Sequence, residues 1–414
     1  MADLVCDSVS VSSQSARRGG GPLKFTKRTR SHLPLATMAI AALLISSCGN
    51  SPQASPSTTS TVGTTTTSSP TNQLQFYPVS FTAVSADQYW LLGQERCQNS
   101  WCTTIIHTTD GGKHFSKVST PPFPIGPTQA PGVYSRYIDT LRFVTPLDGF
   151  AFGIQSSTPS WATTDGGTTW KKTDLGEILA FASSGGYVYA VTASSCDKYG
   201  KCSNLALKRL RVGTSKWSTI TLPVTQPGPL VTMTAYGSSL WISLGAEGTV
   251  NKQELLSSTD YGNHFSSLTS PCFSDLGGRI QASSSTVLWA TCPTGMMAGA
   301  LRSTDGGKNW IPINNKESMN NSAQLAPADD STAILDPRTT APVLRTTDGG
   351  KTFSNVRLGG SGQSWVAWIG FTTPLVGSAL IAYSTGGPSS STIPKEELWR
   401  TVDGGMNWVG PVSF

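Results

Sequence analysis

The ten residues Trp161-Ala162-Thr163-Thr164-Asp165-Gly166-Gly167-Thr168-Thr169-Trp170 decide the fold, because the chain repeats their pattern. The pattern is Ser/Thr-x-Asp-x-Gly-x-x-Trp/Phe. Five further stretches fit it, at residues 108–115 (TTDGGKHF), 258–265 (STDYGNHF), 303–310 (STDGGKNW), 346–353 (TTDGGKTF) and 401–408 (TVDGGMNW). A self-similar motif at intervals of this length predicts a fold assembled from one repeated supersecondary unit.

The residue types of the motif predict a turn between two strands. The carboxylate can accept hydrogen bonds from the backbone N–H groups that follow it, and glycine adopts positive φ without steric cost. We expect the Ser/Thr to end one strand and the aromatic residue to begin the next and pack inward. We predict a structural role for the aspartates, since one site cannot use six equivalent carboxylates: Asp110, Asp165, Asp260, Asp305, Asp348 and Asp403.

The motif resembles the Asp-box, or bacterial neuraminidase repeat (BNR), of β-propellers in the sialidase-like superfamily, and we call each copy an Asp-box. The resemblance implies an all-β fold of four-stranded antiparallel blades with Asp-box turns. The box aspartates are separated by 55, 95, 45, 43 and 55 residues, so one gap is two repeats long. Inside that gap, residues 207–220 (LKRLRVGTSKWSTI) keep Gly213 and Trp217 but have lost the aspartate.

The spacing therefore predicts a seven-bladed β-propeller over residues 74–414, with about 49 residues per blade. In the second repeat we expect strands at 140–144, 149–153, 161–164 and 169–173. In the fourth repeat we expect them at 230–236, 240–244, 253–258 and 264–268. Aromatic residues recur on the expected second strands and are predicted to pack between blades: Trp90, Phe150, Tyr189, Trp241 and Trp289.

The N-terminal residues 1–47 read as a signal peptide with an extended basic region. An apolar run at 33–45 follows four basic residues and is shorter than the about 20 residues that span a bilayer. Residues 45–48 (ISSC) resemble the bacterial lipobox, which implies cleavage before Cys48 and lipid attachment to its sulfur. An ordinary secretory signal with a chance cysteine is the alternative.

Residues 48–73 predict a disordered stalk after the lipidated cysteine. The segment from 50 to 73 is uncharged and mostly Ser and Thr, so it cannot bury a core. As a flexible chain it would span roughly 27 Å. We therefore expect an exported bacterial lipoprotein, anchored to the outer side of a membrane.

Charge gives no sign of a nucleic-acid partner, and we expect none. Beyond residue 47 the chain holds 24 Lys and Arg against 22 Asp and Glu, so the formal net charge of +6 belongs mainly to the signal peptide. No basic stripe remains to track a phosphate backbone.

The cysteines favour an oxidising compartment. Six remain besides Cys6 and Cys48, and six allow fifteen pairings. Two short loops stand out, so we expect local disulfides Cys97–Cys102 and Cys196–Cys202, and Cys272–Cys292 by elimination. Metal binding is the competing interpretation. Because His residues at ligand spacing are missing, we expect no metal and no cofactor.

Function is expected on the face opposite the Asp-boxes. If each box joins the third strand to the fourth, the loops between second and third strands and those between blades share the other face, and these loops vary most. The residues that we consider candidates for ligand contact there are Trp101, Tyr134, Arg136, Tyr199 and Arg279.

Whether the protein is an enzyme stays open at this point, although a sialidase is disfavoured. Sialidases carry a Phe/Tyr-Arg-Ile-Pro motif that this chain lacks; Arg279-Ile280-Gln281 is the nearest match. Arg302, Arg345 and Arg400 occupy one repeat position, which indicates a repeat feature and not a substrate-binding triad. Asp139 and Asp275 could serve a xyloglucanase-type glycosidase, but nothing singles them out.

A binding module fits the sequence better. Residues 141–153 (LRFVTPLDGFAFG), followed by a box, are similar to single-domain propellers of the photosystem II assembly and stability factor type. That resemblance implies an exported, sometimes lipid-anchored protein that binds other proteins. We therefore predict a membrane-tethered protein-binding or assembly module without catalysis. A cell-surface propeller that binds or hydrolyses glycans is the alternative.

Overall fold

The computed structural model describes residues 76–98, 100–123, 138–154, 156, 158–196, 202–224, 230–245, 252–273, 277–313, 316–339, 342–359, 364–383 and 395–412. The signal peptide, Cys48 and the stalk lie outside these residues. Within them the secondary structure consists of strands, and no helix is long and apolar enough to cross a membrane.

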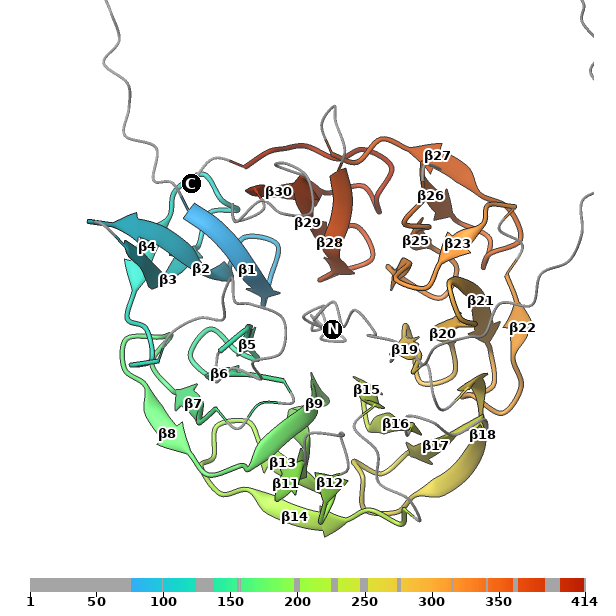
Figure 1. Ribbon diagram of the computed structural model, residues 1–414, viewed down its shortest axis with the longest axis horizontal. Coiled ribbons are helices and arrows are strands. Elements are labelled where there is room, and N and C mark those ends of the chain that lie inside the picture. The colour runs from blue at the N-terminus through green and yellow to red at the C-terminus, as the bar shows by residue number, and fades with distance from the viewer. Residues whose placement is uncertain are drawn as a thin grey trace, which may run out of the picture. The chain divides into compact units, whose positions relative to one another are not determined.

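The strands form seven antiparallel blades around a common axis, as the repeat predicts (Figure 1). Blade 1 contains β1 (Phe76–Ala83), β2 (Tyr89–Cys97), β3 (Ser100–Thr108) and β4 (Ser116–Val118). Blade 2 contains β5 (Thr140–Phe143), β6 (Gly149–Phe152), β7 (Ser160–Thr163) and β8 (Lys171–Thr173). Blade 3 contains β9 (Glu177–Ser184), β10 (Tyr187–Ala193), β13 (Ala206–Arg211) and β14 (Ser218–Thr221), with a small hairpin of β11 (Ser195–Cys196) and β12 (Cys202–Ser203).

The remaining four blades follow in chain order. Blade 4 contains β15 (Leu230–Tyr236), β16 (Ser239–Gly245), β17 (Lys252–Ser258) and β18 (Ser266–Phe273). Blade 5 contains β19 (Arg279–Ala282), β20 (Leu288–Pro293), β21 (Met297–Ser303) and β22 (Ile311–Pro312), and β23 (Met319–Asn320) also pairs with β21. Blade 6 contains β24 (Gln324–Pro327), β25 (Ala333–Asp336), β26 (Val343–Thr346) and β27 (Ser354–Val356), and blade 7 contains β28 (Ser364–Phe371), β29 (Gly377–Tyr383) and β30 (Lys395–Thr401).

Blade 7 departs from the four-stranded pattern. Its fourth strand is reduced to an isolated bridge between Arg400 and Val409. Pro411 follows two residues later and has no N–H to donate to a ladder, so a regular strand cannot continue there.

The core is divided into seven apolar clusters, one at each junction between neighbouring blades. For example, Trp90 of blade 1 stacks on Phe143 of blade 2 with ring centroids 3.8 Å apart. The five second-strand aromatics predicted to lie between blades are all buried. Each sheet therefore buries its faces against the next sheet, as in other repeat folds.

Each Asp-box folds as the hydrogen-bonded turn that its residues predict. In the box of blade 5, the Asp305 carboxylate accepts hydrogen bonds from the backbone N–H of Asn309 at 2.9 Å and of Lys308 at 3.1 Å. The Ser303 hydroxyl donates to Asp305 and accepts from the N–H of Gly307. Hydrogen bonds from Asn309 hold the pKa of Asp305 at about 2.

A second hydrogen bond fastens every third-to-fourth-strand turn to the first-to-second-strand turn of its own blade. Six of these bonds involve a box, such as Gly306 N–H to the Thr286 carbonyl at 2.8 Å. The seventh lies in blade 3, where Val212 N–H donates to the Gly186 carbonyl at 3.0 Å. Residues 207–220 therefore keep the turn position without the box aspartate.

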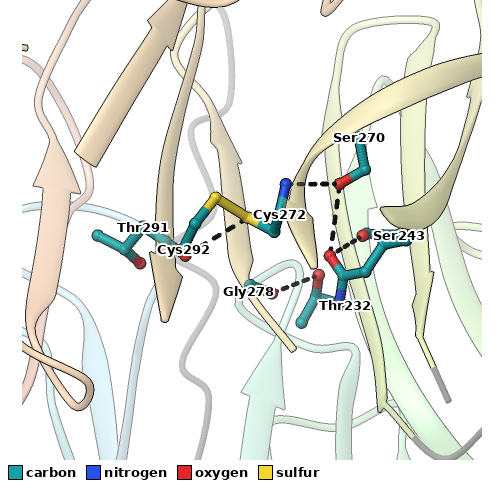
Figure 2. The surroundings of a disulfide bond; sticks show 8 residues. Thr232, Ser243, Ser270, Cys272, Gly278, Thr291 and Cys292 are labelled. Carbon is teal, nitrogen blue, oxygen red and sulfur yellow. Dashed lines mark hydrogen bonds between the residues drawn. A yellow bond between two sulfur atoms is a disulfide. The ribbon is translucent and has the colours of Figure 1, made fainter. Parts of the chain in front are cut away.

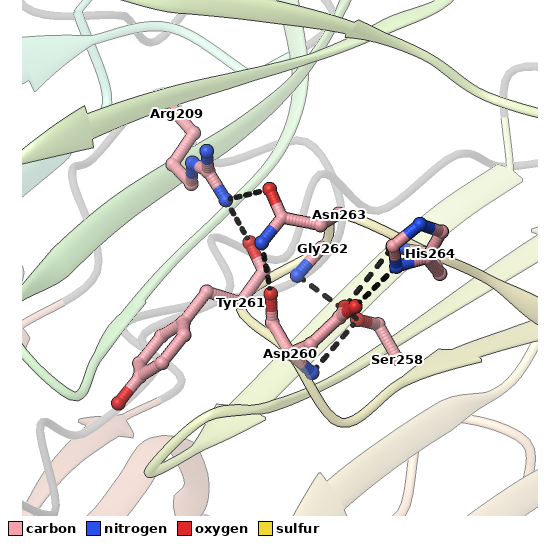
Figure 3. A network of polar contacts seen from close by, with 7 residues as sticks. All are labelled: Arg209, Ser258, Asp260, Tyr261, Gly262, Asn263 and His264. Carbon is pink, nitrogen blue, oxygen red and sulfur yellow. Dashed lines mark hydrogen bonds and ion pairs between the residues drawn. The ribbon is translucent and has the colours of Figure 1, made fainter.

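Arginines on third strands connect neighbouring blades at the same level. Arg209 of blade 3 donates to the Tyr261 carbonyl in the box of blade 4 at 2.7 Å and to Asn263 at 2.9 Å (Figure 3). Arg345 reaches the Gly404 carbonyl of blade 7 at 2.8 Å. Arg400 closes the ring from blade 7 to blade 1, donating to the carbonyls of Gly111, at 2.6 Å, and Ala86.

We predict that Arg400→Met lowers the free energy of unfolding by about 2 kcal/mol, because two backbone carbonyls lose a charged donor at the ring closure. Urea denaturation would measure the loss, and the exposed Arg211→Met serves as the control. An Arg400→Met variant as stable as the wild type would contradict a closing role.

We also predict that the Asp-boxes make the domain acid-sensitive. A carboxylate whose folded pKa is about 2 stabilises the folded state above its unfolded pKa near 4, and this contribution disappears as pH falls from about 4 through 2. The Asp305→Asn variant should melt at a lower temperature than wild type at pH 7, with a gap that narrows towards pH 2. Thermal unfolding of both proteins between pH 7 and pH 2 would measure the difference in melting temperature. A difference that does not change with pH would contradict the prediction.

Candidate functional site

The two faces of the ring differ in character. All Asp-boxes and the first-to-second-strand turns share one face, which we call the box face. The second-to-third-strand turns and the blade connections lie at the opposite ends of the strands, which we call the loop face. This arrangement follows from the strand order within each blade.

The box aspartates are distributed around the ring, one per turn in six blades. Figure 3 shows the box of blade 4, where Asp260 contacts Ser258 and His264 of its own turn. Asp110, Asp165, Asp348 and Asp403 each bond within their own turns in the same way. In the described residues, no group of His, Cys, Asp and Glu could hold a metal ion.

The arginines that resemble a sialidase triad do not converge. Arg345 and Arg400 bind box-turn carbonyls in successive blades, and Arg302 donates to the Asp330 carbonyl of blade 6 at 2.6 Å. Of the two glycosidase candidates, Asp275 lies outside the described residues. Asp139 of blade 2 accepts from the Thr140 hydroxyl at 2.7 Å.

Of the predicted ligand-contact residues, Arg279 is the one whose side chain the structure describes. Tyr134, Arg136 and Tyr199 lie outside the described residues, and Trp101 is described only by its position in β3. Arg279 begins β19, the innermost strand of blade 5, at the loop face. It is therefore positioned at the mouth of the ring, as its place in the repeat predicts.

Arg279 belongs to a polar cluster whose other members are distant from it in the sequence. Its guanidinium donates to the Gln324 side-chain carbonyl of blade 6 at 2.8 Å. Asp336 ends β25, and its carboxylate accepts from the Arg338 backbone N–H at 2.9 Å and the Val366 N–H at 3.2 Å. The Arg338 guanidinium approaches the same carboxylate at 3.5 Å. We call these residues, with the adjacent Trp365, the mouth cluster.

The electrostatics of the mouth cluster favour an anionic ligand. Burial and the nearby Arg338 guanidinium lower the pKa of Arg279 to about 10, so this arginine stays charged at neutral pH. Burial also lowers the pKa of Arg338, and the Asp336 carboxylate opposes this effect. Burial also raises the pKa of Asp336, although Arg338 partly opposes this effect. The mouth cluster thus holds two guanidinium groups and one carboxylate, which leaves an excess positive charge.

Three further features distinguish the mouth cluster from the apolar core between the blades. Arg338 adopts a left-handed backbone conformation, with φ of 57°, which is uncommon for a residue other than glycine and concentrates at functional sites. The buried Gln324 amide nitrogen has no hydrogen-bond partner among the described residues. Trp365 is 37% exposed and immediately precedes Val366, whose backbone N–H donates to Asp336.

The structure also forms the three disulfides that the cysteine spacing predicts. Cys97–Cys102 and Cys196–Cys202 close second-to-third-strand turns on the loop face. Cys272–Cys292 joins the outer strand of blade 4 to the second strand of blade 5 (Figure 2). Three disulfides are characteristic of proteins that fold in an extracytoplasmic, oxidising compartment.

The chain resembles several solved propellers. No protein-family model and no curated protein sequence matches it. It is similar to YCF48 bound to a D1 peptide (14% identity, 67% of this chain and 92% of that chain, TM-score 0.39). It is also similar to the GH74 xyloglucanase from Xanthomonas campestris (12% identity, 80% of this chain and 72% of that chain, TM-score 0.30). A puromycin-hydrolysing peptidase from Mycobacterium tuberculosis matches with 10% identity over 82% of this chain and 54% of that chain, with a TM-score of 0.52. At these identities the likeness shows the propeller fold alone.

We predict that Arg338→Gln destabilises the domain by about 2 kcal/mol at pH 7, because Asp336 then stays buried without its cationic partner. Burial raises the pKa of Asp336 in the folded state, and a raised pKa contributes stability that is present at low pH and lost as pH rises through that pKa. The difference in free energy of unfolding between Arg338→Gln and the wild type should therefore shrink towards pH 4. Urea denaturation at both pH values would measure it. A loss independent of pH would show that Asp336 is not the group left unpaired.

Proposed function

We propose that this protein is a membrane-tethered, extracytoplasmic propeller that binds a protein partner through its loop face and does not catalyse a reaction. In this proposal residues 1–47 are removed, Cys48 carries the lipid, residues 48–73 form the stalk and residues 74–414 form the propeller. The stalk gives the domain a reach of roughly 27 Å from the membrane surface.

The mouth cluster is the observation that carries this proposal. Arginines recognise carboxylates and phosphates through paired, charge-assisted hydrogen bonds, which suits the acidic groups of a partner protein. Arg279 and Gln324 stand at the starts of inner strands, and Asp336 and Arg338 follow at the end of β25 and in the turn after it. The interblade core packs against these strands. Loops that a rigid scaffold positions are a common location for ligand binding.

The same cluster argues against glycoside hydrolysis. That chemistry generally needs two carboxyl groups on either side of the scissile bond, about 5–10 Å apart. Among the described residues of the mouth cluster there is one carboxyl group, Asp336, and its oxygens already accept from Arg338 and Val366. A binding role does not need a second carboxyl group in the cluster.

We predict that cross-linking in native membranes joins the full-length protein to one partner protein through loop-face residues. The Arg279→Gln/Arg338→Gln variant should reduce the yield of that product at least tenfold, because the mouth loses both cations. Arg211→Gln, an exposed arginine on the opposite face, should leave the yield unchanged. Cross-linking mass spectrometry with quantified yields provides the measurement.

The Cys48→Ala variant tests the tether separately. If Cys48 carries the lipid, this variant should leave the membrane fraction and lose the cross-link while the purified domain keeps its melting temperature. Recovery of glycan instead of protein, or a full yield from the double arginine variant, would reject the proposed function.

A further inference from the structure

The turn between β20 and β21 of blade 5 exposes two methionines on the loop face. Met296 is 84% exposed and Met297 is 45% exposed, and Phe273, at the end of β18 in blade 4, is 46% exposed. Phe273 follows Cys272, whose disulfide partner Cys292 lies at the base of this turn (Figure 2). We call Met296, Met297 and Phe273 the methionine tip. The corresponding turns of blades 1 and 6 carry polar residues such as Asn99 and Thr339.

The methionine tip is held on both sides. On one side the Cys272–Cys292 disulfide fixes it to blade 4. On the other side the additional strand β23 pairs Asn320 with Met297. The Asn321 backbone N–H donates to the Met296 carbonyl at 3.1 Å, and the Asn321 side chain donates to the Gly295 carbonyl at 3.1 Å. A disulfide and an added strand therefore support side chains that contribute little to the core.

The segment that supports the tip also builds the mouth cluster. The Asn320 backbone N–H donates to the Pro337 carbonyl at 2.9 Å, next to Arg338. Four residues after Asn320, the Gln324 side chain holds the Arg279 guanidinium. Tip and mouth are thus two ends of one hydrogen-bonded structure. Arg279 pairs with Thr291, and Met296 lies five residues further along the hairpin. At about 3.3 Å per strand residue, the two ends are therefore separated by roughly 17 Å or less.

We propose that the methionine tip and the mouth cluster form one binding surface for an extended segment of a partner protein. This segment carries an apolar side chain for the tip and an acidic group, three to five residues away, for Arg279 and Arg338. The proposal rests on the proposed function and adds the chemistry of the partner. Methionine suits the tip because its flexible, polarisable side chain adapts to different apolar surfaces.

Charge and shape favour a segment of a partner protein over a lipid bilayer or a second copy of this chain. A bilayer is flat and would reach the exposed side chains of the tip but not the Arg338 side chain, which is only 12% exposed. A second copy of the chain would need an acidic counterpart to the mouth on the same surface. The three apolar side chains of the tip also cover only a few hundred Å², well below the about 800 Å² per partner of a stable interface.

A random dodecapeptide library, selected on the purified full-length protein, tests this chemistry. The selected peptides should combine an apolar residue with an acidic group three to five residues away. Synthesised and labelled, they should bind Met296→Ser/Met297→Ser and Arg279→Gln at least tenfold more weakly than wild type by fluorescence anisotropy. The matched control is Val402→Ser/Val409→Ser, which removes side chains that are 72% and 75% exposed on blade 7, outside the tip and the mouth cluster. Its affinity should equal that of wild type.

The outcomes separate this inference from the proposed function. Peptides that bind the methionine variant as tightly as wild type, but lose affinity with Arg279→Gln, would overturn the role of the tip and leave the proposed function standing. Failure to select any peptide would count against both. Loss of self-association, or of binding to phosphatidylcholine vesicles, in the methionine variant would assign the tip to a second copy of the chain or to a bilayer.

Unchanged melting temperatures would show that the variants fold. A photoreactive residue at position 297 gives a second readout, because it should cross-link to the apolar end of a selected peptide.

Discussion

The structure depends on one constraint: each blade is a small twisted sheet that can bury its faces only against the two blades beside it. Seven apolar clusters satisfy this constraint, and each combines side chains from adjacent blades. The ring must therefore close for the first and last sheets to be covered. Among the described residues, the ring closes without a strand of blade 1 joining the sheet of blade 7. The cluster around Phe81 and Trp368, together with Arg400, joins the two blades.

The turns of the box face show which interactions the repeat can lose. The box aspartate acts inside its own turn, whereas the backbone bond between the two turns of a blade fixes the turn to the sheet. Blade 3 lacks the aspartate but keeps the backbone bond from Val212 to Gly186. Arg209 of that blade still reaches the box of blade 4. Loss of a side chain is tolerated because the backbone bond and the interblade contact remain.

The regularity of the box face leaves variation to the loop face. There the chain adds two local disulfides, the strand β23, and the Asp336-Pro337-Arg338 turn with its left-handed arginine. These additions do not repeat from blade to blade. The two local disulfides lie in blades 1 and 3, whereas β23 and the Asp336-Pro337-Arg338 turn lie in blades 5 and 6, where the methionine tip and the mouth cluster share one supporting segment. A uniform scaffold with a locally elaborated surface is what binding by a repeat protein requires.

The sequence alone determined the fold, because the Asp-box turn is built from residues within eight positions of one another and its spacing counts the blades. It also placed Arg279 on an inner strand, since that position follows from the repeat. It could not identify the mouth cluster. Gln324 and Arg338 are 45 and 59 residues away from Arg279, and only the ring geometry brings them together. The exposure of Met296 was equally hidden, because an apolar residue in a turn can face the core or the solvent. Tertiary contacts with β23 and the Cys272–Cys292 disulfide decided its orientation.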